Sequence, residues 1–248
     1  MLGIIGGSAL ARLASLQVSH RQVVRTPYGE PSGALTFGVI GGCEVVFLAR
    51  HGYGQNIPPH EVNYRANIWA LHAKGVKDLV GIAAVGGIAA RYPPGTLVIP
   101  DQIIDYTYGR VNTLFTRADE RVRHIDFTWP YCQTLRVACL EAARLSAVEV
   151  STTAVYAVTQ GPRLESAAEI NRLERDGGDI VGMTGMPEAA IARELGLCYA
   201  TLALVTNHAA GRGASAQAIA IQDITAVVAH GVGKIELILG KLAASHGD

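Results

Sequence analysis

The chain has 248 residues, 49% of them hydrophobic, which suits one α/β domain with a large buried core. Lysine plus arginine equals aspartate plus glutamate at 21 each, so the formal net charge is zero. This balance argues against a nucleic-acid partner, and near-neutral chains often cover apolar surface by oligomerising.

The cysteines are spread along the chain and form no CxxC motif: Cys43, Cys132, Cys139 and Cys198. We therefore predict neither a zinc site nor a disulfide framework, and Cys132 and Cys139 are expected to pack on one helix face. A reduced cytoplasm is the expected location. No basic leader precedes the first apolar residues and no run approaches about 18 apolar positions, so we expect neither export nor membrane insertion.

The first predicted strand, residues 2–5, leads into the turn Gly6-Gly7-Ser8. The two glycines permit a tight turn, and the Ser8 hydroxyl follows beside free backbone N–H groups, which is typical of an oxyanion-binding nest. The turn does not match GxGxxG, so it does not predict a dinucleotide site.

A hairpin is predicted next, with strands at residues 35–40 and 44–49. Arg50 and His51 follow where the second strand ends, and a glycine-broken loop comes after them. A cationic pair at the mouth of a sheet suits anion capture, with phosphate as the first candidate. An ordinary strand-end arginine beside a satisfied histidine is the alternative.

Helical spacing over residues 60–74 predicts the first helix. His60-Glu61 lies at its start, but position 64 is Tyr64, so the HExxH metal motif is absent. Residues 101–129 show little periodicity, and a loop of this length is usually functional or interfacial. Further strands are predicted at residues 78–85, 97–100, 151–159, 179–183 and 198–205, and helices at 131–145, 166–176, 184–195, 217–230 and in a second stretch to 244.

Several segments together resemble the methylthioadenosine phosphorylase and purine nucleoside phosphorylase family, from Gly3 to about Ile224. The resemblance implies a single α/β domain over residues 1–248, with a central mixed sheet flanked by helices. It also implies a homotrimer in which each active site borrows from a neighbouring subunit. The most specific segment is VNYRANIWAL at 62–71, and the others are GIIGGSAL at the start, DLVGIAAVGGI after residue 77, QGPRLESAAE at 160 and GMTGMPEAA at 182.

The resemblance implies a phosphate site. In the family, the loop at the position of Ser8 and the turn after residue 82 contact phosphate. Here Ala83 stands where relatives usually carry a hydroxyl residue, so a side-chain contact is lost while the Ala84 N–H remains. The phosphate-binding residues predicted on this basis are Ser8, Arg50, His51, Ala84 and Thr184.

The resemblance also implies a base pocket. In the purine nucleoside phosphorylase branch a glutamate at the position of Glu165 accepts from the purine N1–H; the alternative is a helix-capping carboxylate. Asn207 can donate to a purine O6 and accept from N7–H, whereas adenine-specific relatives carry aspartate there. Leu164 replaces an aromatic residue, which removes a stacking partner worth about 0.5 to 1.5 kcal/mol.

The sugar pocket is expected to be apolar. Met183 suits the flat face of a ribose, with core packing as the alternative. Ile221 and Ile224, together with Ile219, align with positions that line the 5′-methylthio pocket of methylthioadenosine phosphorylases; an apolar helix face is otherwise core. His124 is placed by the resemblance beside the sugar 5′ end of a neighbouring subunit, and a surface histidine is the alternative.

A 6-oxopurine pocket with an apolar 5′ pocket predicts phosphorolysis of 5′-methylthioinosine to hypoxanthine and 5-methylthioribose 1-phosphate. Asn207, Glu165 and His51 are the predicted catalytic residues. No metal or organic cofactor is expected, because inorganic phosphate is the co-substrate. The alternatives are a general purine nucleoside phosphorylase acting on inosine or guanosine, a methylthioadenosine phosphorylase, and a nucleoside-binding protein without turnover.

Overall fold

The computed structural model describes residues 1–8, 10, 12–116 and 122–246. Its strands are β1 Leu2–Gly6, β2 Gln17–Gln22, β3 Leu35–Ile40, β4 Cys43–Ala49, β5 Asp78–Gly87, β6 Leu97–Val98, β7 Gln102–Asp105, β8 Val155–Val158, β9 Ile180–Gly182 and β10 Cys198–His208. Its α-helices are α1 Tyr64–Ala73, α2 Gln133–Leu145, α3 Ala167–Arg175, α4 Gly185–Glu194 and α5 Ile221–Ala244, and a 3-10 turn, η1, covers Gly213–Ser215.

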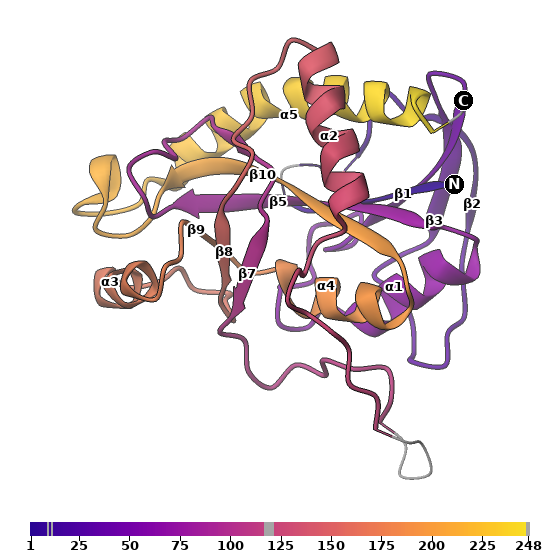
Figure 1. Ribbon diagram of the computed structural model, residues 1–248, viewed down its shortest axis with the longest axis horizontal. Coiled ribbons are helices and arrows are strands. Elements are labelled where there is room, and N and C mark those ends of the chain that lie inside the picture. The colour runs from indigo at the N-terminus through magenta and orange to yellow at the C-terminus, as the bar shows by residue number, and fades with distance from the viewer. Residues whose placement is uncertain (9, 11, 117–121, 247–248) are drawn as a thin grey trace.

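Within this described part, ten strands form one mixed sheet in the order β2-β3-β4-β1-β5-β9-β8-β7, and β10 pairs with β5 and β6 off this path. Strands β4, β1, β5 and β10 are parallel neighbours, so their carboxyl ends meet at one edge of the sheet. Helices α2 and α5 cover one face, and α1 and α4 cover the other (Figure 1). The predicted α/β domain with a mixed sheet flanked by helices is therefore confirmed.

The central strand β5 changes neighbours along its length. Its first half pairs with β1 as far as Gly81, opposite Ile5, and its last two residues pair with β9. Residues 82–85 have no described strand on that side, although β10 covers their other edge. Buried backbone groups need hydrogen-bond partners, so this gap in the sheet is a place where a ligand can supply them.

Two helices differ from the predicted boundaries. Helix α1 begins at Tyr64 rather than at residue 60, because Asn63 is its N-cap and accepts from the Ala66 N–H at 3.1 Å. Helix α5 runs unbroken from Ile221 to Ala244, where two helices were predicted. Gly231 lies inside it and permits close packing on β10, since a Cβ there would lie 2.4 Å from the Leu204 side chain.

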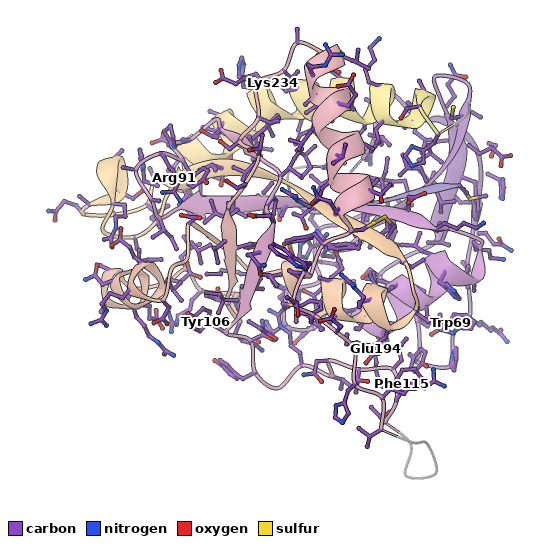
Figure 2. The ribbon with its side chains drawn as sticks, viewed as in Figure 1. Trp69, Arg91, Tyr106, Phe115, Glu194 and Lys234 are labelled. Carbon is purple, nitrogen blue, oxygen red and sulfur yellow. A yellow bond between two sulfur atoms is a disulfide. The ribbon has the colours of Figure 1, made fainter. Side chains whose placement is uncertain are left out.

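The cysteine prediction is wrong for one pair. Cys132 and Cys198, which are 66 positions apart in sequence, form a disulfide with their Cα atoms 5.0 Å apart (Figure 2). Cys132 precedes α2, and its N–H donates to the Tyr199 carbonyl at 2.8 Å, which holds the start of α2 against β10. Cys139 is a free, buried residue of α2, which agrees with the prediction that it is a packing residue. Tertiary contacts create the bonded pair, and the sequence spacing carries no sign of it.

The aperiodic stretch predicted at residues 101–129 contains one strand, β7, and then runs out past the end of α4. There the Glu194 carboxylate accepts from the Thr113 hydroxyl at 2.6 Å and from the Leu114 N–H at 2.7 Å. Figure 2 labels Glu194 and Phe115 at this edge of the molecule. Residues 117–121 lie outside the described residues.

Candidate active site

A cavity of about 200 Å³ opens where the parallel strands end. Strand β9 runs antiparallel to β5, with Val181 opposite Gly86, so the residues after it run back along the gap in β5. The segment after β8 follows β9 in the same direction, because these two strands are parallel. The cavity is lined by most of the predicted site residues: Ser8, Arg50, His51, Ala84, Leu164, Glu165, Met183, Thr184, Asn207 and Ile224.

Two predicted residues do not line this cavity within the chain. Ile221 is the first residue of α5 and is 60% exposed, whereas Ile219 and Ile224 face the cavity. Ile221 and Ile224 are three positions apart on α5, but only Ile224 lines the cavity. His124 is exposed, and its role in a neighbouring subunit stays a prediction.

Arg50 forms the floor of the phosphate end. Its Nε and Nη2 donate to the two oxygens of Glu188 at 2.6 and 2.7 Å, and its Nη1 donates to the Ile82 carbonyl at 2.9 Å. A guanidinium has five N–H donors, so these contacts leave two. The carboxylate fixes the plane of the group. Arg50 lines the cavity while being only 1% exposed.

The charge of Arg50 is secured by the same partner. Burial would lower the pKa of the guanidinium, but the charge and hydrogen bonds of Glu188 reverse this and raise the pKa above its ordinary value. Glu188 is fully buried and also accepts from the Tyr199 hydroxyl at 2.8 Å. Sequence reasoning missed Glu188; the available signal was a single carboxylate in the apolar start of α4, since an unpaired carboxylate is almost never fully buried.

Backbone geometry places the Ala84 N–H in the gap. The Val85 carbonyl faces β10, where it lies 3.3 Å from the Thr206 hydroxyl oxygen, whereas the Ile82 carbonyl accepts from Arg50 on the opposite side. Backbone groups alternate sides along a strand, so the N–H of Ala84 points the same way as the Ile82 carbonyl. Gly7 completes this end, because a Cβ there would lie 2.7 Å from Arg50 Nη1.

His51 lies beside Arg50 with one ring nitrogen already engaged. Its Nδ1 lies 2.8 Å from the Ile57 carbonyl, and because a carbonyl can only accept, Nδ1 carries the proton. Burial lowers the pKa of His51, and the adjacent Arg50 charge lowers it further. The neutral ring therefore keeps the Nε2 lone pair as an acceptor at neutral pH.

The depressed His51 pKa predicts a loss of stability in mild acid. The unfolded chain takes up this proton near pH 6.5 while the folded chain resists it, so stability falls as pH drops below about 6.5. We expect the change in urea midpoint between pH 7.5 and pH 5.5 to be larger in the wild type than in His51→Asn, which does not titrate there. Equal changes in the two proteins would contradict the assignment.

Glu165 is held at the base end by a threonine. The Thr159 hydroxyl donates to a Glu165 oxygen at 2.5 Å, and the Thr159 N–H donates to the Gly182 carbonyl at 2.8 Å. The capping alternative for Glu165 is wrong: Ser166 is the N-cap of α3, and the reciprocal capping carboxylate is Glu169. The Glu165 side chain is therefore free of helix capping and lines the cavity.

Asn207 is also fixed by short local contacts. It follows a register shift in β10 after Val205, and its side chain lines the cavity. Its Oδ1 accepts from the Thr206 hydroxyl at 3.0 Å, and its Nδ2 donates to the His208 carbonyl at 2.7 Å. One N–H and one lone pair remain, which is what a group carrying both an acceptor and a donor requires.

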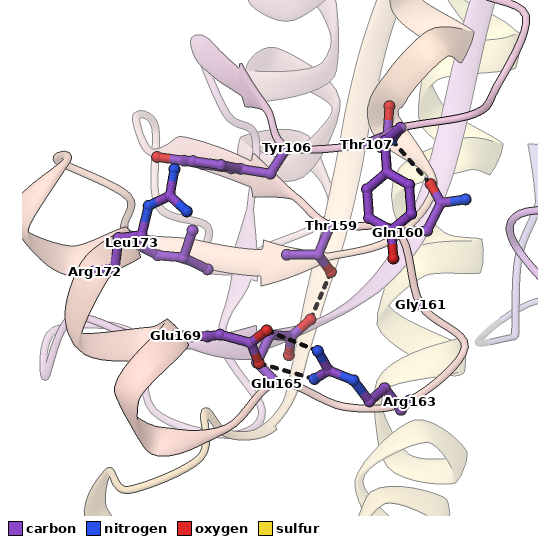
Figure 3. Close-up of a pocket in the computed structure, with 11 residues that line it drawn as sticks. Tyr106, Thr107, Thr159, Gln160, Gly161, Arg163, Glu165, Glu169, Arg172 and Leu173 are labelled. Atoms are coloured by element: carbon purple, nitrogen blue, oxygen red, sulfur yellow. Dashed lines mark hydrogen bonds and ion pairs between the residues drawn. The ribbon is translucent and has the colours of Figure 1, made fainter.

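A second cavity of about 410 Å³ lies on the other side of Glu165 and shares that residue with the first. Figure 3 shows Thr159 directed at Glu165, and Arg163 paired with Glu169 at 2.7 Å. Arg172 in its wall lies 3.7 Å from a carboxylate of its own helix. Both arginines therefore already have anionic partners, and the phosphate end of the first cavity is the better anion site.

Metal ligation finds no support among the described side chains: they contain no group of three histidine, cysteine, aspartate or glutamate residues placed to hold an ion. Cofactor independence stays a prediction. For residues 1–8, 10, 12–116 and 122–246, no helix has the length and apolar character needed to cross a membrane.

Comparisons with known proteins identify the family of the chain. A family model described as phosphorylase superfamily matches residues 1–243. A probable S-methyl-5′-thioinosine phosphorylase of Pseudomonas syringae pv. tomato is 49% identical over 242 residues, covering 98% of each chain. A 6-oxopurine nucleoside phosphorylase of Pyrococcus furiosus is 48% identical over 215 residues, covering 85% of this chain and 80% of that protein.

Solved structures extend the likeness to the fold. Methylthioadenosine phosphorylase from Schistosoma mansoni, in complex with adenine, superposes with a TM-score of 0.94 at 32% identity, covering 99% of this chain and 91% of that chain. The chain therefore belongs to the phosphorylase superfamily and is a pentosyltransferase of the purine nucleoside phosphorylase type.

Proposed function

We propose that the enzyme cleaves 5′-methylthioinosine with phosphate, giving hypoxanthine and 5-methylthioribose 1-phosphate. One observation carries the proposal: a single cavity joins a polar end holding Glu165 and Asn207 to an apolar side holding Ile219 and Ile224. The first end suits a 6-oxopurine, and the second suits a methylthio group rather than a hydroxyl. Relatives named for this substrate, at 49% and 47% identity, support the same reading.

The proposed chemistry uses charge on both sides of the glycosidic bond. As the bond stretches, the ribosyl group gains oxocarbenium character and negative charge moves onto the purine. Asn207 donates to O6 and accepts from N7–H as the leaving base becomes protonated there, and Glu165 accepts from N1–H. Phosphate held by Arg50, the Ala84 N–H and Thr184 attacks C1′ from the opposite end of the cavity. The neutral His51 accepts a hydrogen bond from a phosphate hydroxyl at Nε2.

A second candidate is a 6-oxopurine nucleoside phosphorylase acting on inosine or guanosine. The Pyrococcus furiosus relative carries that name at 48% identity. The two candidates share the base pocket and differ only at the sugar 5′ position. An apolar pocket rejects a hydroxyl weakly, so both substrates can turn over, and the ratio between them decides.

One assay tests both candidates. Release of free base is followed by ultraviolet absorbance for methylthioinosine, inosine, guanosine and methylthioadenosine, each with and without phosphate. We expect phosphate-dependent release with the highest kcat/KM on methylthioinosine. A higher kcat/KM on inosine would establish the second candidate, and comparable cleavage of methylthioadenosine would contradict the role given to Asn207.

The apolar side of the cavity makes a separate prediction. Ile224→Ser removes apolar contact with the methylthio group, worth about 1.5 kcal/mol, so we expect kcat/KM for methylthioinosine to fall roughly tenfold relative to inosine. Ile221→Ser is the matched control, because Ile221 lies on the same helix and is 60% exposed outside the cavity. An equal change in both variants would show that α5 does not select the 5′ group.

A homotrimer and a cytoplasmic location complete the proposal. The location no longer rests on the cysteines, because Cys132 and Cys198 form a disulfide. In this trimer His124 would reach the sugar 5′ end of the cavity of a neighbouring subunit. His124 does not line the cavity of its own chain. We expect light scattering to give three times the 26.2 kDa chain mass. A fully active monomer would contradict the proposed role of His124 in a neighbouring subunit.

A further inference from the structure

Arg110 lies in the stretch between β7 and α2 and binds two other loops at once. Its Nη2 donates to the carbonyls of Thr159 and Gln160 at 3.3 and 2.7 Å, and its Nε donates to the Gln160 side chain at 3.0 Å. Its Nη1 donates to the carbonyls of Met183 and Met186 at 2.8 and 2.6 Å. All its donor nitrogens therefore face acceptors on the two segments that follow β8 and β9.

These two segments carry one base contact and one sugar contact of the proposed pocket. The first, residues 159–165, holds Glu165, and Figure 3 shows it passing from Thr159 through Gln160 to Glu165. The second, residues 183–187, holds Met183 and begins α4. The segments touch directly, since a Cβ on Gly161 would lie 2.4 Å from the Met183 sulfur.

Arg110 itself does not line the reaction cavity. Tyr64 lies under its guanidinium, with the ring centroid 5.4 Å away and the hydroxyl 3.2 Å from Nη1. Tyr64 is buried in α1, so this contact anchors the arginine to the body of the domain. A planar group with donors in fixed directions can set the separation of two loops, whereas the single ammonium of a lysine cannot span both.

We propose that Arg110 is a positioning residue that holds the Glu165 segment and the Met183 segment at the spacing required by the bound nucleoside. This inference rests on the base pocket proposed above. Arg110 touches neither substrate, and it acts by fixing where Glu165 meets the base and where Met183 meets the ribose. Among the proposed phosphate contacts only Thr184 lies on a segment that Arg110 binds. Arg50, His51 and Ala84 come from other elements, so phosphate binding depends less on Arg110 than nucleoside binding does.

The test measures steady-state kinetics of Arg110→Met and Arg110→Lys with methylthioinosine and with inosine. We expect kcat/KM for the nucleoside to fall about 100-fold in Arg110→Met, the size typical of a misplacement of about 1 Å, while the phosphate KM changes less than about fivefold. Arg110→Lys keeps the charge and the aliphatic stem and supplies a folded variant if Arg110→Met does not accumulate. Arg110→Lys is expected to lose about tenfold.

Arg136→Met is the matched control for a loss of structure alone. Arg136 also donates to backbone carbonyls, those of Pro100 and Thr152 at 2.9 and 2.6 Å, but none of its partners lines the cavity. We expect its kcat/KM per folded molecule, with folding checked by circular dichroism, to stay within about threefold of the wild type.

A double-mutant cycle with Glu165→Gln separates positioning from general destabilisation. If Arg110 acts through Glu165, Glu165→Gln costs much less activity in the Arg110→Met or Arg110→Lys background than in the wild type. Equal losses in both backgrounds, or a nucleoside kcat/KM within threefold of wild type in a folded Arg110 variant, would overturn the inference while the proposed function stands. A wild type that releases no base from either nucleoside would overturn both.

Discussion

Replacing Asn207 by aspartate is expected to shift base preference from 6-oxopurines toward 6-aminopurines. The carboxylate cannot donate to O6, but it can accept from a 6-amino group. Each unpaired buried polar group costs about 1 to 3 kcal/mol. The substitution removes one contact with methylthioinosine and adds one with methylthioadenosine, so the ratio of their kcat/KM values changes by roughly 10² to 10⁴. The ratio is the quantity to measure, in parallel assays of both nucleosides.

Absolute rates in Asn207→Asp are expected to fall on both substrates. In the wild type, Nδ2 of Asn207 donates to the His208 carbonyl at 2.7 Å, and a carboxylate oxygen in that place would be repelled. Asn207→Ala is the control, because it removes the side-chain contacts without reversing any. Its ratio should fall but still favour methylthioinosine, because Glu165 still accepts from the N1–H that only a 6-oxopurine carries. An unchanged ratio in Asn207→Asp would show that another residue selects the base.

The predicted site residues that the structure brings into one cavity share one physical basis. Arg50 and Asn207 each lie at the end of an apolar strand, and parallel strands bring such ends to one edge whatever their separation in sequence. The gap in β5 that makes Ala84 available depends on where β1 ends and β9 begins. No local sequence pattern encodes that gap, so the phosphate contact of Ala84 could be predicted only from the family resemblance.

The missed elements lack a local hydrophobic signal. Strand β2 is exposed along its whole length, so the sequence shows no alternation between buried and exposed faces, and its pairing with β3 is what makes it a strand. Arg110 was missed for a related reason, because its acceptors are backbone carbonyls on segments about 50 and 75 residues away. Backbone acceptors leave no trace in side-chain identity.

Glu188→Gln is expected to cause the largest loss of stability among these variants. Glutamine keeps the shape but leaves the buried Arg50 charge without a counter-ion and sets one N–H group against another. Removing one partner of a buried pair typically costs about 3 to 5 kcal/mol in the free energy of unfolding. We also expect kcat/KM for phosphate to fall about 100-fold, because the guanidinium loses its fixed plane. Urea unfolding and phosphate titrations measure the two effects.

Two further variants show whether the pair or a single hydrogen bond is responsible. Tyr199→Phe removes only the hydroxyl that donates to Glu188, so it should cost about 1 kcal/mol and leave the phosphate KM near that of the wild type. Arg50→Met combined with Glu188→Leu removes both charges, and we expect it to regain most of the stability lost in Glu188→Gln while phosphorolysis stays abolished. Stability and activity separate in that double variant because apolar side chains can fill the space of the pair but cannot bind phosphate. A Glu188→Gln protein that unfolds at the wild-type urea concentration would contradict the role of Glu188 in holding Arg50.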